Sequence, residues 1–261
     1  MINIDREYVT AAFLEYTDRF DSSDNKIILK REHTFRVADN CDYIARELGL
    51  DKDDVNLAWL LGMLHDIGRF EQVKRYGTFV DAKSVDHAKL GSQLLFKEGL
   101  MELFLPGSEE TLLKGDTFND LSVINVAISN HNTFKIEEGL RQREEMFCKI
   151  IRDADKIDIF KVIYETPLQQ IYGYDEEYIK KAAITDEVKE QFLERHTILR
   201  AIKKTPADNY ISFIAFAFEL EFECSRELTK EQGYLKKMFD FKWENEDTAK
   251  FFELAKEMIK P

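Results

Sequence analysis

Leu60-Leu61-Gly62-Met63-Leu64-His65-Asp66-Ile67-Gly68-Arg69-Phe70 is the stretch that decides the fold of this chain. It begins as an apolar helical run and ends in a histidine next to an aspartate, so two strong metal ligands follow a helix that should be buried. Burial of a carboxylate is costly unless a metal ion or a cationic side chain lies against it. An isolated His-Asp pair is more simply a capping aspartate beside a core histidine, so the case for chemistry depends on the rest of the chain.

Composition limits the class of protein. The chain has 261 residues, 44% of them hydrophobic and 12% aromatic, which is enough for a well-filled core. The formal net charge of -13 disfavours a broad nucleic-acid surface or an anionic-membrane surface. Three widely separated cysteines without a Cys-x-x-Cys motif predict neither a disulfide framework nor a thiolate zinc site. The first residues contain no basic leader followed by an apolar core, and the apolar runs are too short to cross a bilayer, so we expect a cytoplasmic protein that does not bind membranes.

Helical periodicity dominates the sequence and predicts an all-α fold, a helical bundle with a C-terminal helical extension. We expect helices over about 5–20, 26–48, 55–65, 120–129 and 141–159, and a helix that begins at His87 and is capped by Asp86. The segment from Gly68 to Val85 is expected to be irregular, and Gly99 to Asn119 to be a connection with one short helix.

Two parts of the chain differ in character. Residues 1–160 are expected to form the helical core, and residues 161–261 a C-terminal helical extension packed on it, since no linker rich in Pro, Gly or Ser separates them. In the second part we expect a charged helix over 184–205 with His196 at its surface. An apolar helix is expected over 209–222, although the alternation that starts at Phe218 also allows a strand.

The histidines are distributed in a way that points to a metal site. Four of the five fall at an end or on the inward face of successive predicted helices: His33, His65, His87 and His131. Asp155 lies at the edge of a buried helical stripe, whereas Asp153 and Asp158 are expected to be surface charges. Imidazole and carboxylate suit first-row divalent metals, and a helix bundle can gather such ligands in its interior.

The order of these motifs resembles that of the HD superfamily of metal-dependent phosphohydrolases. The resemblance covers about residues 26–159 and depends on three separated segments: His33-Thr34-Phe35-Arg36-Val37, His65-Asp66-Ile67-Gly68-Arg69 and Ala154-Asp155-Lys156-Ile157. Within the superfamily, the chain is most similar to small HD-domain proteins that carry the segment His-Asp-Ile-Gly-Arg-Phe-Glu, here His65 to Glu71. Membership implies an all-helical fold and a metal held between helices.

The resemblance also implies a set of metal ligands. The residues implied for a first ion are His33, His65, Asp66 and Asp155. Four N/O ligands leave room for two waters in an octahedral shell, which favours Mn, Fe, Co or Ni over zinc, with Mg less attracted to imidazole. His87 and His131 resemble the additional ligands of two-metal members, in which the aspartate of the pair bridges both ions. One ion is therefore implied and two are allowed, since Asn130 stands where many two-metal relatives have another histidine.

The implied chemistry is hydrolysis of a phosphomonoester or phosphodiester in a small phosphorylated metabolite, with a nucleotide expected. A divalent metal held by Asp66 activates a water for attack on phosphorus, and Arg69 stabilises the developing charge. Arg69 and Lys156 are the expected phosphate-binding cations, and His87 could bind a phosphate oxygen while cationic instead of binding a metal. Two alternatives stay open: a regulatory HD module that binds a nucleotide without turning it over, and a di-iron oxygenase, which the Asn130 departure disfavours. The sequence does not predict the oligomeric state.

Overall fold

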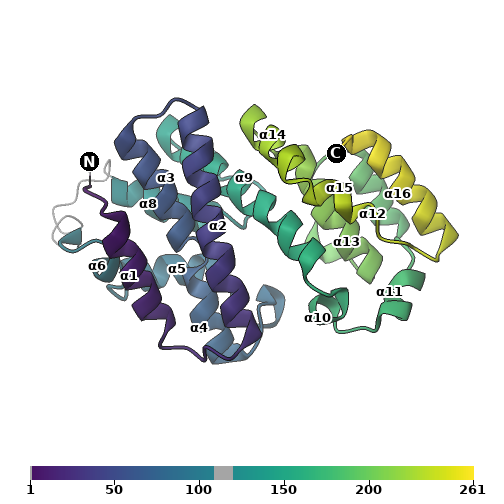
Figure 1. The fold of residues 1–261 in the computed structure, drawn as a ribbon, viewed down its shortest axis with the longest axis horizontal. Helices are drawn as coiled ribbons and strands as arrows, with labels where there is room; N and C mark the ends of the chain where they lie inside the picture. Colours follow the sequence, from purple (N-terminus) through teal and green to yellow (C-terminus); the bar gives the residue numbers. More distant parts are fainter. Residues whose placement is uncertain (1, 109–119) are drawn as a thin grey trace. The chain divides into compact units, whose positions relative to one another are not determined.

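The computed structural model describes residues 2–108 and 120–261 (Figure 1). Every regular element in this part of the chain is helical, so the predicted all-α class is confirmed. The strand alternative near Phe218 is wrong, because that residue lies in the 3-10 helix η3 (Ala215–Glu219). In the same described residues, no helix combines the length and the apolar character that a membrane span requires.

The chain divides into two compact units, Met1–Asp155 and Lys156–Pro261. This division lies five residues before the expected one at residue 160, and the packing of the second unit on the first stays a prediction. The first unit contains the following elements: α1 (Arg6–Thr17), α2 (Asn25–Glu47), α3 (Lys52–Leu64), α4 (Ile67–Tyr76), the 3-10 helix η1 (Asp81–Lys83), α5 (His87–Phe96), α6 (Met101–Phe104), α8 (Asp120–Asn130) and the part of α9 (Gln142–Glu165) up to Asp155. Helix α6 is the short helix expected between Gly99 and Asn119, and residues 109–119 of that connection lie outside the described residues.

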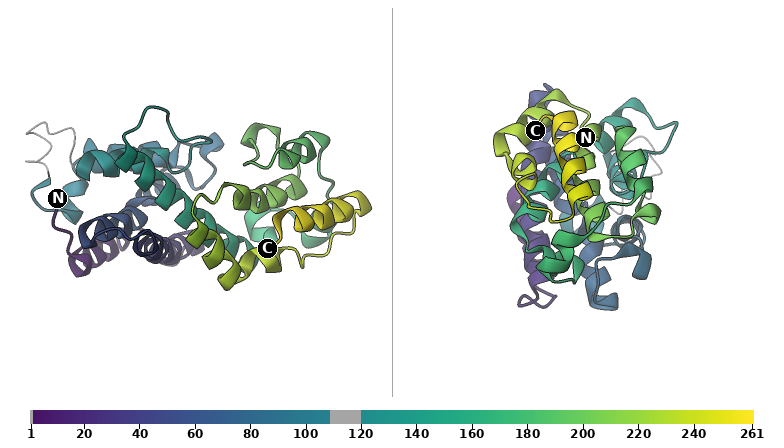
Figure 2. Two further views of the ribbon diagram at one scale, coloured as in Figure 1. Left: turned by 90° about the horizontal axis from the view of Figure 1, so that it is seen from above. Right: turned by 90° about the vertical axis from the view of Figure 1, so that its right-hand side faces the viewer.

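Helix α3 is the central helix of the first unit. Its side chains from Leu57 to Leu64 are buried on all sides, as expected of a helix that is apolar around its whole circumference. The side chain of Asp51 caps its first turn by accepting hydrogen bonds from two backbone N–H groups. Gly62 lets α3 approach α2 closely, because a Cβ at this position would lie 2.4 Å from the Cα of Ala38. Consequently α2 and α3 lie side by side in Figures 1 and 2.

The expected irregular segment from Gly68 to Val85 is wrong in its first half, which is helix α4. The prediction placed Gly68 at the start of the irregular segment, but this glycine lies in α4 and permits close packing. A Cβ on Gly68 would lie 2.2 Å from the carbonyl oxygen of His87 and 2.6 Å from the amide nitrogen of Gly91. The fully buried ring of Phe70 then anchors α4 in an aromatic cluster with Phe13, with ring centroids 5.8 Å apart. Helix α4 ends at Gly77, whose φ of +67° suits a glycine.

Helix α5 begins where the sequence predicts. The carboxylate of Asp86 accepts hydrogen bonds from the backbone N–H groups of Ala88 and Lys89, and His87 is the first helical residue. The N-terminal cap fixes where the His87 side chain leaves the backbone.

Helix α9 is buried over most of its circumference between Ile150 and Asp158. The expectation that Asp153 and Asp158 are surface charges is therefore wrong, since their exposed fractions are 0% and 2%. A helix with one buried stripe would leave such residues exposed, but this part of α9 is buried on nearly all sides.

The second unit consists of the part of α9 from Lys156 onward and the helices that follow it. In order they are α10 (Leu168–Tyr172), α11 (Glu176–Lys181), α12 (Asp186–Leu193), η2 (Arg200–Ile202), α13 (Pro206–Ile214), η3, α14 (Glu223–Gln232), α15 (Tyr234–Met238) and α16 (Glu246–Ile259). Helix α16, drawn in yellow in Figure 2, packs Phe251 against Phe192 of α12, with ring centroids 5.6 Å apart. The expected helix over 184–205 ends at Leu193, and His196 lies in the following turn, hydrogen-bonded to Glu194.

Candidate metal centre

The first unit brings all six sequence-predicted ligands into one cluster. Helix α2 carries His33, α9 carries Asp155, and α5 begins with His87. His65 and Asp66 form the turn between α3 and α4, and His131 directly follows α8. Each of these histidine side chains is at most 3% exposed. The ligands therefore come from five separate segments, each a helix or the end of one, so the helix packing fixes their positions.

The first ligand set consists of His33, His65 and Asp155, with one oxygen of Asp66 against it. The Nε2 atom of His33 lies 3.3 Å from Nε2 of His65 and 3.2 Å from Oδ1 of Asp155. Oδ2 of Asp66 lies 3.5 Å from Nε2 of His33 and 3.4 Å from Nε2 of His65. The ligand atoms of His33, His65 and Asp155 all lie within 4.8 Å of one another, which is close enough for them to contact a single ion.

The second ligand set consists of His87 and His131, with the other oxygen of Asp66. Oδ1 of Asp66 lies 3.3 Å from Nε2 of His87 and 3.7 Å from Nε2 of His131. The two Nε2 atoms are 3.0 Å apart. The carboxylate of Asp66 thus turns one oxygen to each ligand set, which is the arrangement of a carboxylate that bridges two ions.

Hydrogen bonds on the far side of the rings fix three of the imidazole tautomers. Nδ1 of His65 lies 2.7 Å from the carbonyl oxygen of Gly62, and Nδ1 of His131 lies 2.7 Å from that of Ile128. A carbonyl only accepts, so these Nδ1 atoms donate, and an imidazole that carries its only N–H at Nδ1 directs the lone pair of Nε2 into the cluster. Nδ1 of His87 lies 2.8 Å from a carboxylate oxygen of Asp81 and is held in the same way.

The facing lone pairs provide a test of whether a metal ion fits. Burial lowers the pKa of His87 to about 4, although its hydrogen bond to Asp81 acts in the opposite direction, so this ring is neutral at neutral pH. When both rings carry their only N–H at Nδ1, they direct lone pairs at each other across the 3.0 Å between Nε2 of His87 and Nε2 of His131. Such lone pairs repel unless a cation lies between them. The donor set and its tautomers therefore suit a divalent metal ion.

A partly buried network that the sequence did not predict holds His87. Asp81 accepts from Arg69 at 2.8 Å and from Gln72 at 2.9 Å, in addition to its contact with His87. Gln72 is fully buried, and its amide nitrogen also donates to the hydroxyl of Ser84. Burial raises the pKa of Asp81, but the hydrogen bond from His87 and the Arg69 charge outweigh this effect and hold it well below its usual range. No sequence signal marked Asp81, since it lies between two helices and not on a helical face.

Lys30 is the second residue that sequence reasoning missed. Its Nζ lies 2.5 Å from Oδ2 of Asp66, beside the first ligand set. Burial raises the pKa of Asp66, but the Lys30 ammonium and the facing histidines hold that pKa well below its usual range. A signal for Lys30 existed, because it precedes His33 by three residues and so lies on the same face of α2.

The remaining sequence-predicted residues lie in different surroundings. Arg69 donates from one nitrogen to Gln72, Asp81 and the carbonyl oxygen of Phe79, and its Nε lies 3.5 Å from Oδ1 of Asp66. Lys156 belongs to the second unit, where its Nζ lies 3.2 Å from the carboxylate of Glu219 and 3.1 Å from the carbonyl oxygen of the same residue. The role of each residue in binding phosphate stays a prediction.

Asn130 stands where many relatives have another histidine, but its side chain forms hydrogen bonds with the backbone. Its Oδ1 accepts from the N–H of Glu137 and its Nδ2 donates to the carbonyl oxygen of Val126, both at 3.0 Å. Within the described residues, the second ligand set therefore offers two imidazoles and one carboxylate oxygen, against two imidazoles and two carboxylate oxygens around the first.

Comparison with protein families agrees with this geometry. Residues 31–160 match the family model described as HD domain, which includes all six predicted ligands. This part of the chain is an HD domain, and the domain suggests membership in a superfamily of metal-dependent hydrolases. HD domains bind divalent metals, and the clustered histidines and aspartates could hold such an ion. Searches of curated proteins and of solved structures returned no match.

Proposed function

We propose that this HD domain is a metal-dependent phosphohydrolase that cleaves a phosphomonoester or phosphodiester bond in a small phosphorylated metabolite, with nucleotides as the substrate class to test first. The observation that carries the proposal is the placement of Asp66 between the two ligand sets, with one oxygen toward each. Phosphoryl-transfer centres use such a shared carboxylate to hold two divalent ions a few ångströms apart.

The proposed roles follow from the positions of the side chains. His33, His65, Asp66 and Asp155 would hold the first ion, and Asp66, His87 and His131 a second. Bound ions would supply an activated water and Lewis-acid stabilisation of the phosphoryl group. Mixed imidazole and carboxylate ligands favour Mn, Fe, Co or Ni over Mg.

The chain's own groups would assist in two ways. Arg69, close to Asp66, would bind the phosphate and offset its charge, which an acidic protein must do locally. The hydrogen bonds from the Nδ1 atoms would keep the imidazoles oriented throughout turnover, because their acceptors lie on packed helices and on a partly buried network. No serine or cysteine nucleophile is required for this chemistry.

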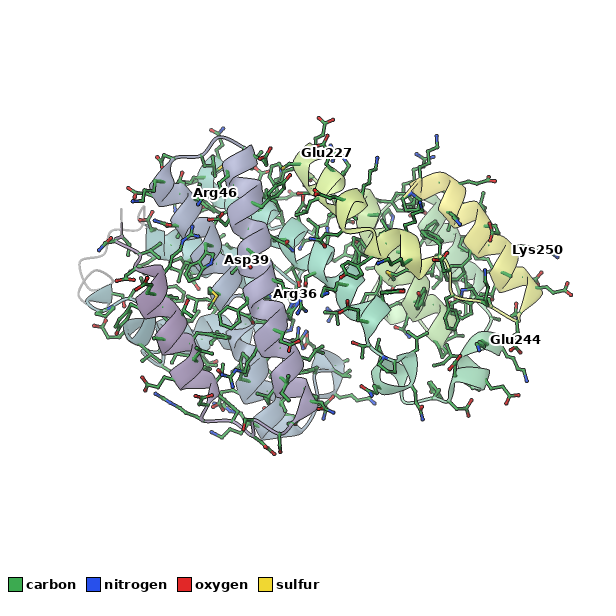
Figure 3. The ribbon with its side chains drawn as sticks, viewed as in Figure 1. Arg36, Asp39, Arg46, Glu227, Glu244 and Lys250 are labelled. Carbon is green, nitrogen blue, oxygen red and sulfur yellow. The ribbon has the colours of Figure 1, made fainter. Side chains whose placement is uncertain are left out.

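Phosphate release and metal content test the proposal together. The protein is purified, its metals are measured by elemental analysis, and a panel of nucleotides and sugar phosphates is screened with Mn, Fe, Co, Ni and Mg. We expect release of phosphate from at least one class, and loss of both metal and activity in Asp66→Ala. The matched control is Asp39→Ala, which removes an exposed carboxylate on α2 (labelled in Figure 3).

Two results would contradict the proposal. Unchanged phosphate release by Asp66→Ala would show that the activity does not come from this centre. Tight nucleotide binding without any product across all five metals would instead support a regulatory HD module.

A further inference from the structure

The two cations nearest the candidate metal centre lie on opposite sides of Asp66. Nζ of Lys30 lies 2.5 Å from Oδ2, the oxygen that faces the first ligand set. Nε of Arg69 lies 3.5 Å from Oδ1, the oxygen that faces the second. Lys30 comes from α2 and Arg69 from α4, so the packing of two different helices fixes this pair around one carboxylate.

Both cations also lie near one aromatic ring. The centroid of the Phe79 ring is 5.8 Å from Nζ of Lys30 and 5.7 Å from Cζ of Arg69. The carbonyl oxygen of Phe79 accepts from Arg69 at 2.6 Å, which holds this part of the chain in place. The buried Nε of Arg69 makes no hydrogen bond, so one N–H donor of this side chain has no acceptor. The Phe79 ring thus lies beside both positive charges, and Arg69 still has an N–H donor without an acceptor.

Exposure shows how an anion would reach the centre. The histidine side chains of both ligand sets are at most 3% exposed, whereas the side chains of Lys30 and Arg69 are 17% and 13% exposed. The carboxylates with comparable exposure, Asp155 and Asp81, repel an anion. Among the described side chains that form ion pairs with Asp66, Lys30 and Arg69 are therefore the accessible groups that attract an anion.

We propose that Lys30 binds the substrate phosphate, and that Lys30 and Arg69 together favour a terminal phosphate, as in a phosphomonoester, over a phosphodiester. A terminal phosphate carries three free oxygens and close to two negative charges at neutral pH, so it can contact both cations and the metal ions at once. A diester has only two free oxygens and one charge. The proposal rests on the phosphohydrolase function proposed above and narrows its substrate class.

The contact between Lys30 and Asp66 predicts that removal of the Lys30 charge affects metal binding and phosphate binding differently. The ammonium lies on the same carboxylate oxygen that would hold the first ion, and two positive charges on one oxygen repel each other. Removing the charge of Lys30 should therefore leave metal affinity unchanged or raise it, while weakening phosphate binding. A residue that only supports the fold would affect both kinds of binding in the same direction.

Binding measurements on the manganese-loaded full chain test this inference without turnover. Isothermal titration calorimetry compares methyl phosphate with dimethyl phosphate, which match a monoester and a diester with little other bulk. The variants are Lys30→Met, which keeps the stem but not the charge, and Lys30→Arg, which keeps the charge. The control is Lys26→Met, which removes an exposed lysine from the preceding turn of α2.

We expect Lys30→Met to bind methyl phosphate at least about tenfold more weakly than wild type, as loss of a charge-assisted hydrogen bond predicts, and to bind Mn²⁺ at least as tightly. Lys30→Arg should retain most of the phosphate affinity, and Lys26→Met should match wild type. Wild type should prefer methyl phosphate to dimethyl phosphate.

Equal methyl phosphate affinity in Lys30→Met and wild type would overturn the inference, as would loss of metal together with phosphate in that variant. A wild-type preference for dimethyl phosphate, or no binding of methyl phosphate, would overturn it too. Failure of the function is distinguishable, because a protein that binds methyl phosphate through Lys30 but releases phosphate from no ester keeps this inference and refutes the phosphohydrolase.

Discussion

The two ligand sets around Asp66 are built in different ways. The first depends on regular helices, since His33 lies inside α2, Asp155 inside α9, and the ring of His65 is held by a carbonyl of α3. The second depends on His87, whose orientation comes from Asp81 in the segment between α4 and α5. The carboxylate of Asp66 therefore joins a first ligand set that helix packing holds in place to a second one that depends on a polar network.

Each ligand set also has its own close helix contact. Gly62 lets α3 approach α2, and these helices carry His65 and His33. Gly68 lets α4 approach the start of α5, which carries His87. Two glycines in one short stretch thus bring together the helices behind the two sets. Because different contacts support the two ligand sets, we expect that a substitution can weaken metal binding at one set and leave the other intact.

Removal of a first-set ligand should have the largest effect. His33→Ala deletes the imidazole closest to both Asp155 and His65, and we expect loss of the first ion and a decrease in phosphate release of about a thousandfold or more. Elemental analysis and initial rates measure the two effects. His196→Ala is the control, since that side chain lies outside the HD domain. If His33→Ala retained half or more of the activity, the first ligand set could not be the one on which phosphate release mainly depends.

Removal of the Asp81 charge should weaken only the second set. Asp81→Asn leaves His87 without its carboxylate partner, and we expect affinity for the second ion to fall by about 10- to 100-fold, as losses of outer-shell partners do. Calorimetric titration of the metal-stripped protein with Mn²⁺ should show an unchanged first binding event. His131→Ala is the positive control, because it removes a ligand of the same set directly. A change confined to the first event would contradict the assignment.

A side chain at position 68 should disturb the packing of α4 against α5. Gly68→Ala places a methyl group against the backbone of α5, which cannot withdraw as a flexible side chain would, and we expect a loss of about 1–3 kcal/mol in the free energy of unfolding. Urea unfolding measures this loss, and the second Mn²⁺ affinity should decrease with it.

The control for crowding is Gly77→Ala at the end of the same helix. No atom lies within 4 Å of a Cβ built there, and only the left-handed backbone opposes the change. Its second Mn²⁺ affinity should match that of wild type. Equal metal affinities in Gly68→Ala and wild type would show that the close contact does not position His87.

The same contrast explains how much the sequence could predict. Helical periodicity and motif order sufficed for the all-α class and for the six clustered residues, because a histidine on a helical face or beside a cap has a position that the helix dictates. Asp81 and Gln72 were missed because their contacts depend on how the chain folds between α4 and α5, which has no period. Gly68 was misinterpreted because a glycine that breaks a helix and one that permits close packing look the same in a sequence.

The buried aspartates of α9 show a second limit. Asp153 was expected at the surface, yet it is fully buried, because a helix that is enclosed on most sides has no exposed polar face. Lys30 was within reach, since its spacing from His33 places both on one face, but a lysine near predicted metal ligands was not expected to approach a carboxylate.

The smallest predicted effect is a difference in pH dependence between a buried and a surface histidine. The pKa of His87 is lowered from its ordinary 6.5 to about 4, chiefly by burial. Between these pH values the unfolded chain binds a proton that folded His87 does not, so the metal-stripped protein should lose stability as the pH falls from 6.5 toward 4. His87→Gln should lose less over this interval, as measured by thermal unfolding at several pH values.

His196 should show the opposite sign. Its hydrogen bond to the carbonyl oxygen of Thr197, supported by Glu194, raises its pKa, so its contribution to stability is present below its ordinary pKa and is lost as the pH rises through the raised value. His196→Gln should therefore lower stability at acidic pH and leave it unchanged at alkaline pH. If both variants instead shifted stability in the same direction between pH 4 and 6.5, burial could not be lowering the pKa of His87, and the neutral imidazole assigned to the second ligand set would be contradicted.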